Sequence, residues 1–361
     1  MTSADAATSR RDVWARGLRK GWATCWELAK VIVPVSVAVT ALKHTPVLPW
    51  LSAVSEPLMR WLGLSGEAAV VLVAGNAVGL YPAIGAMASL NLSAKEVLTL
   101  ALMLSFSHNL LVETAVTKRL GVSYWGVMAY RVGLAVVAAL LVNVAYGLFT
   151  PEQTVPAPRP AAVEAAAGGQ GSTASVTYGA AVAGTGTEAS PAAAEPARGP
   201  VRRALRDWFG TVAADAAGGL SRTLGLMVVI IFPLMVAIEA LEASGALERI
   251  SRRIEPYMGW LGLSGKAGFP LMAGLVFGLA YGAGVLLEAS RDGGLTQKDK
   301  RLLCVFLVAC HAAVEDTFLF VPLGINPFLL LGGRLILAVL LTAAAARAAA
   351  LASRLGEGMA R

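Results

Sequence analysis

The feature that most constrains this chain is a stretch of sequence that occurs twice. Residues 56–80 read EPLMRWLGLSGEAAVVLVAGNAVGL, and residues 255–279 read EPYMGWLGLSGKAGFPLMAGLVFGL. Fifteen of these 25 aligned positions carry the same residue. The correspondence extends in both directions, so we interpret residues 22–150 and 221–350 as two copies of one structural unit.

Each copy contains four long apolar blocks. A membrane-spanning helix needs about 20 mostly apolar residues. The chain is 56% apolar and only 15% charged, a balance that excludes an ordinary soluble enzyme. We predict an all-α polytopic membrane protein without catalytic activity or cofactor. The blocks are residues 22–42, 68–90, 97–116 and 124–149 in the first copy, and residues 222–243, 267–289, 302–321 and 328–350 in the second.

The second block of each copy is unusually rich in glycine. It reads AGNAVGLYPAIGA in the first copy and AGLVFGLAYGAGV in the second. Glycine at this density disfavours a straight helix. Broken backbone at membrane depth is tolerated where it is buried in protein or lines a cavity. We therefore predict that each block is a re-entrant helical hairpin, which leaves about six transmembrane helices and an architecture typical of secondary transporters.

Basic residues predict the orientation of these spans. They cluster before the first helix and at Lys118-Arg119 in the first copy, and at 249–253 and 291–301 in the second. Lysine and arginine favour the cytoplasmic side. All these clusters share one side if the hairpins do not cross and the second copy is inverted. We therefore expect a multi-pass protein of a bacterial-type inner membrane, with both termini cytoplasmic.

Three segments lie outside the two copies. Residues 1–21 form a polar, basic N-terminal tail, and residues 351–361 form a C-terminal tail. Residues 151–220 combine an Ala/Gly/Pro-rich stretch with a basic segment that leads into the second copy. The Ala/Gly/Pro-rich composition cannot bury a core, so we predict a disordered tether, placed outside the cell by the topology above.

Two histidines are the strongest candidates for a binding role. His108 and His311 occupy equivalent positions, each near the middle of an apolar block. Ionisable side chains are costly inside a bilayer, so function is the first hypothesis and helix packing the alternative. An inverted repeat should bring the two histidines toward its axis. The other predicted substrate-binding residues lie at the hairpin tips, where broken helices expose backbone polar groups: Asn76, Gly79, Tyr81, Gly278 and Tyr281.

Acidic residues suggest a coupling site next to one histidine. Glu315 lies one helical turn after His311, and the aligned position of the first copy is Val112. Side chains at this spacing meet on one face of a helix. We therefore predict that His311 and Glu315 carry a proton or cation that is coupled to transport.

Two ion pairs are expected near the same depth. Glu113 and Asp316 are equivalent by position, and so are Arg131 and Arg334 in the helices that follow. Each acid can meet its arginine across an antiparallel helix pair. We interpret Glu113–Arg131 and Asp316–Arg334 as structural ion pairs that hold the two helices together.

The motifs around these residues resemble those of a known family. GNAVGLYPAIGAM followed by SHNLLVETAV, and FGLAYGAGVLLEAS followed by CHAAVEDTFLF, look like Gate ("nucleoside recognition") domains. Such domains occur in concentrative nucleoside transporters, in ferrous-iron permeases and in spore maturation proteins A and B. The resemblance covers both copies and is closest to stand-alone duplicated Gate proteins. It implies transport without naming a solute.

These observations support three functional hypotheses. The first is a secondary transporter or permease for a small polar solute, nucleoside-like or an ion, with its site at the bilayer midplane between the copies. The second is a non-transporting scaffold or assembly factor of the spore-maturation type. The third is a divalent-metal permease that uses the two histidines and nearby carboxylates, although no ligand set is assigned. We expect membrane lipid and a small solute or ion as partners, and no nucleic acid. The sequence leaves open whether the chain forms a homo-oligomer.

Overall fold

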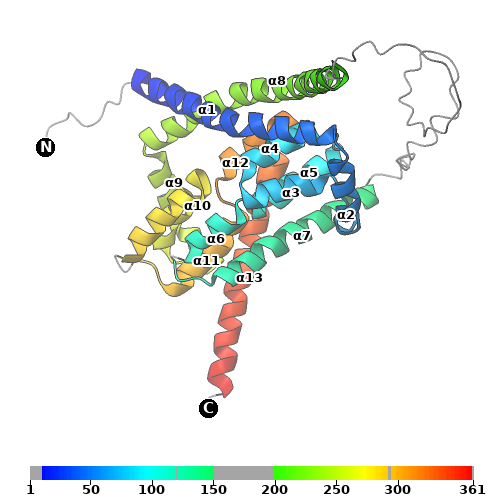
Figure 1. Ribbon diagram of the computed structural model, residues 1–361. Coiled ribbons are helices and arrows are strands. Elements are labelled where there is room, and N and C mark those ends of the chain that lie inside the picture. The colour runs from blue at the N-terminus through cyan, green and yellow to red at the C-terminus, as the bar shows by residue number, and fades with distance from the viewer. Residues whose placement is uncertain (1–9, 119, 150–198, 292–293, 360–361) are drawn as a thin grey trace, which may run out of the picture.

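The computed structural model describes residues 10–118, 120–149, 199–291 and 294–359, and the described part is all-α (Figure 1). The first copy and the end of the N-terminal tail form α1 Arg10–Lys43, α2 Val47–Trp61, α3 Ala68–Ala77, α4 Leu80–Ser89, α5 Ala94–Ser107, α6 Leu110–Lys118 and α7 Tyr124–Phe149. The second copy and the segments that flank it form α8 Gly199–Ala243, α9 Ala246–Ile254, α10 Gly268–Arg291, α11 Gln297–Ala309, α12 Ala313–Leu319 and α13 Pro327–Met359, with short 3₁₀ helices at Glu255–Leu261, Gly265–Ala267 and Val321–Leu323.

Within the described residues, six helical segments are long and apolar enough to cross a membrane. This finding confirms the predicted all-α polytopic class. The segments are Asp12–Lys43, Ala94–Lys118, Tyr124–Leu148, Leu205–Ala243, Gln297–Leu319 and Pro327–Leu355, while Ala68–Ala77 and Gly265–Leu279 are apolar but shorter.

The longest contact between the copies joins α1 and α8, which lie side by side in Figure 1. Arg16 binds Glu239 near one end, and His44 lies 2.9 Å from Asp215 near the other, so the helices are antiparallel. Gly17 permits a close approach, because a Cβ atom there would lie 2.6 Å from the Val236 backbone. α8 begins at Gly199, so residues 199–220 are helical, whereas residues 151–198 of the predicted tether lie outside the described residues.

The two glycine-rich blocks are broken at equivalent glycines. In the first copy, Gly79 separates α3 from α4 with φ at 146°. In the second, Gly278 interrupts α10 with φ at 87° and ψ at 174°. Residues with a side chain rarely adopt a positive φ angle, so glycine is the residue that allows these breaks. That each block enters and leaves the membrane on one side stays a prediction.

The histidine-bearing spans are broken as well, which the sequence pattern did not indicate. α5 ends at Ser107 and α6 begins at Leu110, while α11 ends at Ala309 and α12 begins at Ala313. The turns contain the non-glycine residues Asn109 and Ala312 at φ values of 48° and 41°. Such values are uncommon outside glycine, so tertiary contacts must hold both turns in place.

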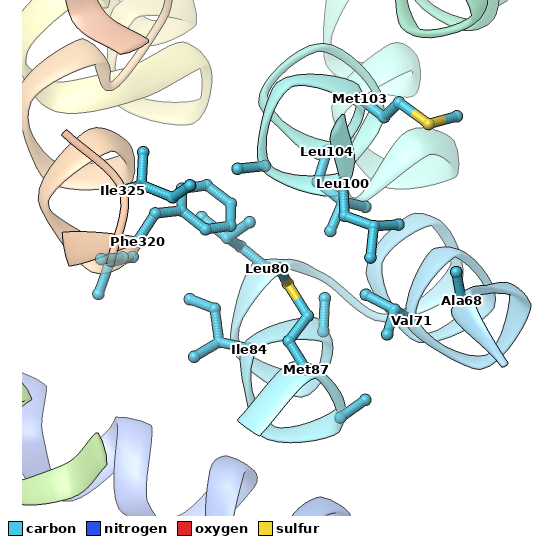
Figure 2. Packing of buried hydrophobic residues seen from close by; sticks show 14 of the residues in the cluster. Ala68, Val71, Leu80, Ile84, Met87, Leu100, Met103, Leu104, Phe320 and Ile325 are labelled. Carbon is cyan, nitrogen blue, oxygen red and sulfur yellow. The ribbon is translucent and has the colours of Figure 1, made fainter. Parts of the chain in front are cut away.

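The hydrophobic core joins the two copies to each other. Figure 2 shows Phe320 and Ile325 of the second copy beside Leu80 and Ile84 of α4. Phe320 and Ile84 are fully buried. The broken helices are therefore held by packing that draws on both halves of the chain.

Candidate functional site between the two copies

A cavity of about 310 Å³ lies where the four helix breaks meet. Its lining residues come from both copies, including α1 of the first copy, and both histidines are among them. The residues are Val31, Val78, Gly79, Leu80, Tyr81, Pro82, His108, Asn109, Glu113, Phe277, Gly278, Leu279, His311, Ala312, Glu315 and Asp316. The helix breaks thus bring together polar groups that lie about 200 residues apart in the sequence.

The two histidines are buried and held in the same way. Nδ1 of His108 lies 2.6 Å from the carbonyl oxygen of Leu104, and Nδ1 of His311 lies 2.7 Å from that of Leu307. A carbonyl oxygen only accepts hydrogen bonds, so each Nδ1 is the protonated nitrogen. Each Nε2 therefore carries a lone pair when the ring is neutral.

Both Nε2 atoms face the carboxylate of Glu113. His108 Nε2 lies 3.2 Å from Glu113 Oε1, and His311 Nε2 lies 3.2 Å from Glu113 Oε2. The ring centroids of the histidines are 5.3 Å apart, so the expected approach of the two residues is found. Glu113 is thus a site residue that bridges the copies, whereas its position in the sequence indicated only an ion pair.

Arg131 supports the first histidine turn and is fully buried. Its Nε donates to the carbonyl of Phe106 at 2.9 Å, and one terminal nitrogen donates to the carbonyl of His108 at 2.7 Å. The same nitrogen binds Glu113 Oε2 at 2.6 Å. A helix end leaves carbonyl groups without partners. Arg131 satisfies two of them and also fixes the carboxylate.

Arg334 plays the corresponding part in the second copy. One terminal nitrogen donates to the carbonyl of His311 at 2.9 Å and to that of Ser105, in the first copy, at 3.3 Å. The same nitrogen lies 3.6 Å from Asp316 Oδ2. Both ion pairs expected from the sequence are therefore present. Each arginine also binds the carbonyl group of a histidine.

Glu315 has a hydrogen-bond partner other than His311. It accepts a hydrogen bond from the hydroxyl group of Tyr81 at 3.2 Å. Within the described residues, no hydrogen bond or ion pair joins it to His311. The reason is that α12 begins at Ala313, so His311 lies outside the helix and the one-turn relation is lost. A coupling role for His311 and Glu315 stays a prediction.

The remaining predicted site residues divide into three groups. Gly79, Tyr81 and Gly278 line the cavity. Asn76 is not among the lining residues: its Nδ2 donates to the carbonyl of Leu72 at 2.8 Å, and its Oδ1 is buried without a partner in the described structure. The side chain of Tyr281 lies outside the described residues.

Sequence reasoning missed Asn109 and Val31 as lining residues. Asn109 follows His108 directly, and its backbone nitrogen donates to the carbonyl of Gly75 at 2.8 Å. The equivalent bond in the second copy runs from Ala312 to the carbonyl of Gly274 at 3.2 Å. These bonds tie each histidine turn to its glycine-rich helix. No local sequence motif predicts these two backbone hydrogen bonds, although asparagine tolerates a positive φ angle better than most residues.

The Gate family, described as nucleoside recognition, matches this sequence twice, at residues 25–131 and 224–324. The chain belongs to the Gate family. The two matches support the duplication and contain both histidines, Glu113, Glu315 and Asp316. Gate membership indicates a transport-related role in a membrane and no catalytic family.

Two relatives of this chain are membrane proteins. The chain is 38% identical over 336 residues to "Uncharacterized membrane protein YvoD" of Bacillus subtilis, and the aligned region covers 93% of this chain and 95% of that protein. It is 39% identical over 75 residues to "Inner membrane protein YjiG" of Escherichia coli K12, and that aligned region covers 19% of this chain and 49% of that protein. No solved structure matches this Gate protein. These findings confirm a multi-pass membrane protein.

Proposed function

We propose that this Gate protein is a permease that moves a small polar solute through the cavity between its two copies. The observation that carries this proposal is the lining of the cavity. Both glycine breaks and both histidine turns reach it, and its volume of about 310 Å³ suits a small solute or a hydrated ion.

The arrangement of helix breaks supports transport. A broken helix exposes backbone N–H and C=O groups, which bind ions and polar molecules in secondary transporters. Four such breaks around one cavity create a polar site within an otherwise apolar bundle. A scaffold that only holds partners would gain nothing from burying so many polar groups, because each costs free energy to desolvate.

The antiparallel α1–α8 pair supports an inverted relation between the copies. These helices occupy equivalent positions, since Pro34 of α1 corresponds to Pro233 of α8. Equivalent helices of an inverted repeat run in opposite directions across a membrane. Such a repeat can open the same central site to either face by rocking one half against the other.

The test begins with purified protein and a thermal-shift screen against nucleosides, divalent metals, amino acids and organic anions. A ligand that binds the folded state raises the melting temperature by mass action. Each stabilising solute is then measured for uptake into proteoliposomes. We expect saturable uptake of at least one solute class.

Val31→Trp and Val37→Trp form a matched pair of variants for this assay. Val31 lines the cavity, whereas Val37 lies on the same helix with 41% of its surface exposed. Tryptophan at position 31 should fill the cavity and abolish uptake, and tryptophan at position 37 should preserve it. Equal uptake by both variants would contradict a route through the cavity, and no uptake of any class by folded protein would favour the scaffold.

A further inference from the structure

The centre of the site holds three groups that accept hydrogen bonds. The His108 and His311 Nε2 atoms and a Glu113 oxygen all lie within 4.8 Å of one another. The His311 side chain is only 2% exposed, and no described group donates a hydrogen bond to its Nε2 atom. Glu113 Oε2 already binds Arg131, whereas the buried His311 Nε2 atom has no donor. An unpaired buried acceptor is costly, so a cation shared by the three groups would stabilise the site.

The spacing of these atoms suits a tetrahedral metal ion. Zinc binds histidine nitrogen and carboxylate oxygen at about 2.0–2.2 Å, which places neighbouring ligand atoms of a tetrahedron about 3.3 Å apart. The two Nε2–Glu113 distances are each 3.2 Å, with His108 facing Oε1 and His311 facing Oε2. A rotation of the Glu113 carboxylate that places one oxygen between the two Nε2 atoms would bring all three groups onto one ion beside the cavity that they line.

The surrounding contacts are those that orient metal ligands. A metal-binding histidine usually donates its other ring nitrogen to a carbonyl or carboxylate. Both histidines do so, through Nδ1 to Leu104 and Leu307. Arg131 binds Glu113 Oε2, so the carboxylate is also held by a neighbouring side chain.

The charges around the cavity favour a cation. Three carboxylates line it, from Glu113, Glu315 and Asp316. Two buried arginines, Arg131 and Arg334, lie within ion-pair distance of Glu113 and Asp316 respectively. With all five groups ionised and both imidazoles neutral, the site retains one negative charge. An anionic solute would meet repulsion there, whereas a divalent cation would be attracted.

We infer that His108, His311 and Glu113 form a binding site for a divalent transition-metal ion of the zinc type. Two imidazole nitrogens and one carboxylate favour such an ion over Mg²⁺ or Ca²⁺, which bind oxygen ligands. The metal site stands on the geometry alone. That the ion is also the transported solute rests on the proposed permease function.

Binding is measured on the full chain, purified through a tag without histidines. Titration with Co²⁺ should produce the strong visible absorption of tetrahedral cobalt at one ion per chain, and added Zn²⁺ should displace it. His311→Gln and Glu113→Gln should each weaken binding by more than about tenfold. His44→Gln is the matched control, since it removes the third histidine of the chain, which pairs with Asp215.

X-ray absorption of the zinc-loaded wild-type protein tests the site without any variant. We expect two imidazole ligands, oxygen ligands and no sulfur. No binding by folded wild-type protein, sulfur ligation through Cys304 or Cys310, or equal loss in His44→Gln would each overturn the metal site. Loss of the metal site leaves the permease proposal intact, whereas metal binding without any solute flux in proteoliposomes overturns the permease and retains the site.

Discussion

Replacing Arg131 by alanine should destabilise the folded protein strongly, because it removes the partner of several buried groups at once. The Arg131 side chain is 0% exposed and that of Glu113 only 14%. The substitution leaves this carboxylate unpaired and frees the carbonyl groups of Phe106 and His108. Removing one partner of a buried ion pair costs about 3–5 kcal/mol, so we expect a loss of that size in the free energy of unfolding.

A double-mutant cycle separates the ion pair from the rest of this loss. Glu113→Gln and Arg131→Gln are made singly and together, and unfolding is followed by circular dichroism in mixed detergent micelles. The joint change should recover part of the loss, with a coupling free energy of about 2 kcal/mol. Arg347→Ala is the control, because Arg347 is exposed on α13 and its replacement should shift stability by less than about 0.5 kcal/mol. Effects of Glu113→Gln and Arg131→Gln that add within about 0.5 kcal/mol would refute a direct interaction.

Two further predictions concern topology and the glycine breaks. A cysteine at Gln170 should react with impermeant thiol reagents only from outside the cell, and one at Lys298 only from inside; reaction of both from one face would contradict the inverted repeat. Gly278→Ala should destabilise by about 1–3 kcal/mol, because alanine is strained at its positive φ and its Cβ would lie 3.3 Å from that of Ala312. Gly333→Ala, in open space on α13, should be neutral or stabilising, and equal melting temperatures for the two variants would contradict this reasoning.

Much of this architecture follows from the sequence because repetition and glycine leave strong local signals. The duplication places His108 and His311 at equivalent positions, and their approach follows from that symmetry. Gly79 and Gly278 mark the first set of breaks, since few other residues adopt the backbone found there. The two ion pairs could be predicted because each acid and its arginine lie at similar depths on two adjacent helices.

The second set of breaks could not be found in this way. Asn109 and Ala312 lie in apolar segments without glycine or proline at the turn, so local preference favours continuous helices. The turns persist because Arg131, Arg334 and the glycine-rich helices bind the freed backbone groups. These are tertiary contacts between distant segments. For the same reason, sequence spacing assigned Glu315 to His311, whereas the turn presents the histidine to Glu113 of the other copy.

The central claim, that the cavity is a passage reached from both faces of the membrane, can be tested without knowing the solute. Val78→Cys is introduced into a chain whose Cys25, Cys304 and Cys310 are replaced by alanine, since Val78 lines the cavity. An impermeant thiol reagent is applied to right-side-out and inside-out vesicles, with Leu140→Cys on α7 as the control outside the cavity. We predict labelling of position 78 from both faces and of position 140 from neither. Labelling of position 78 from only one face, or from none, would contradict it.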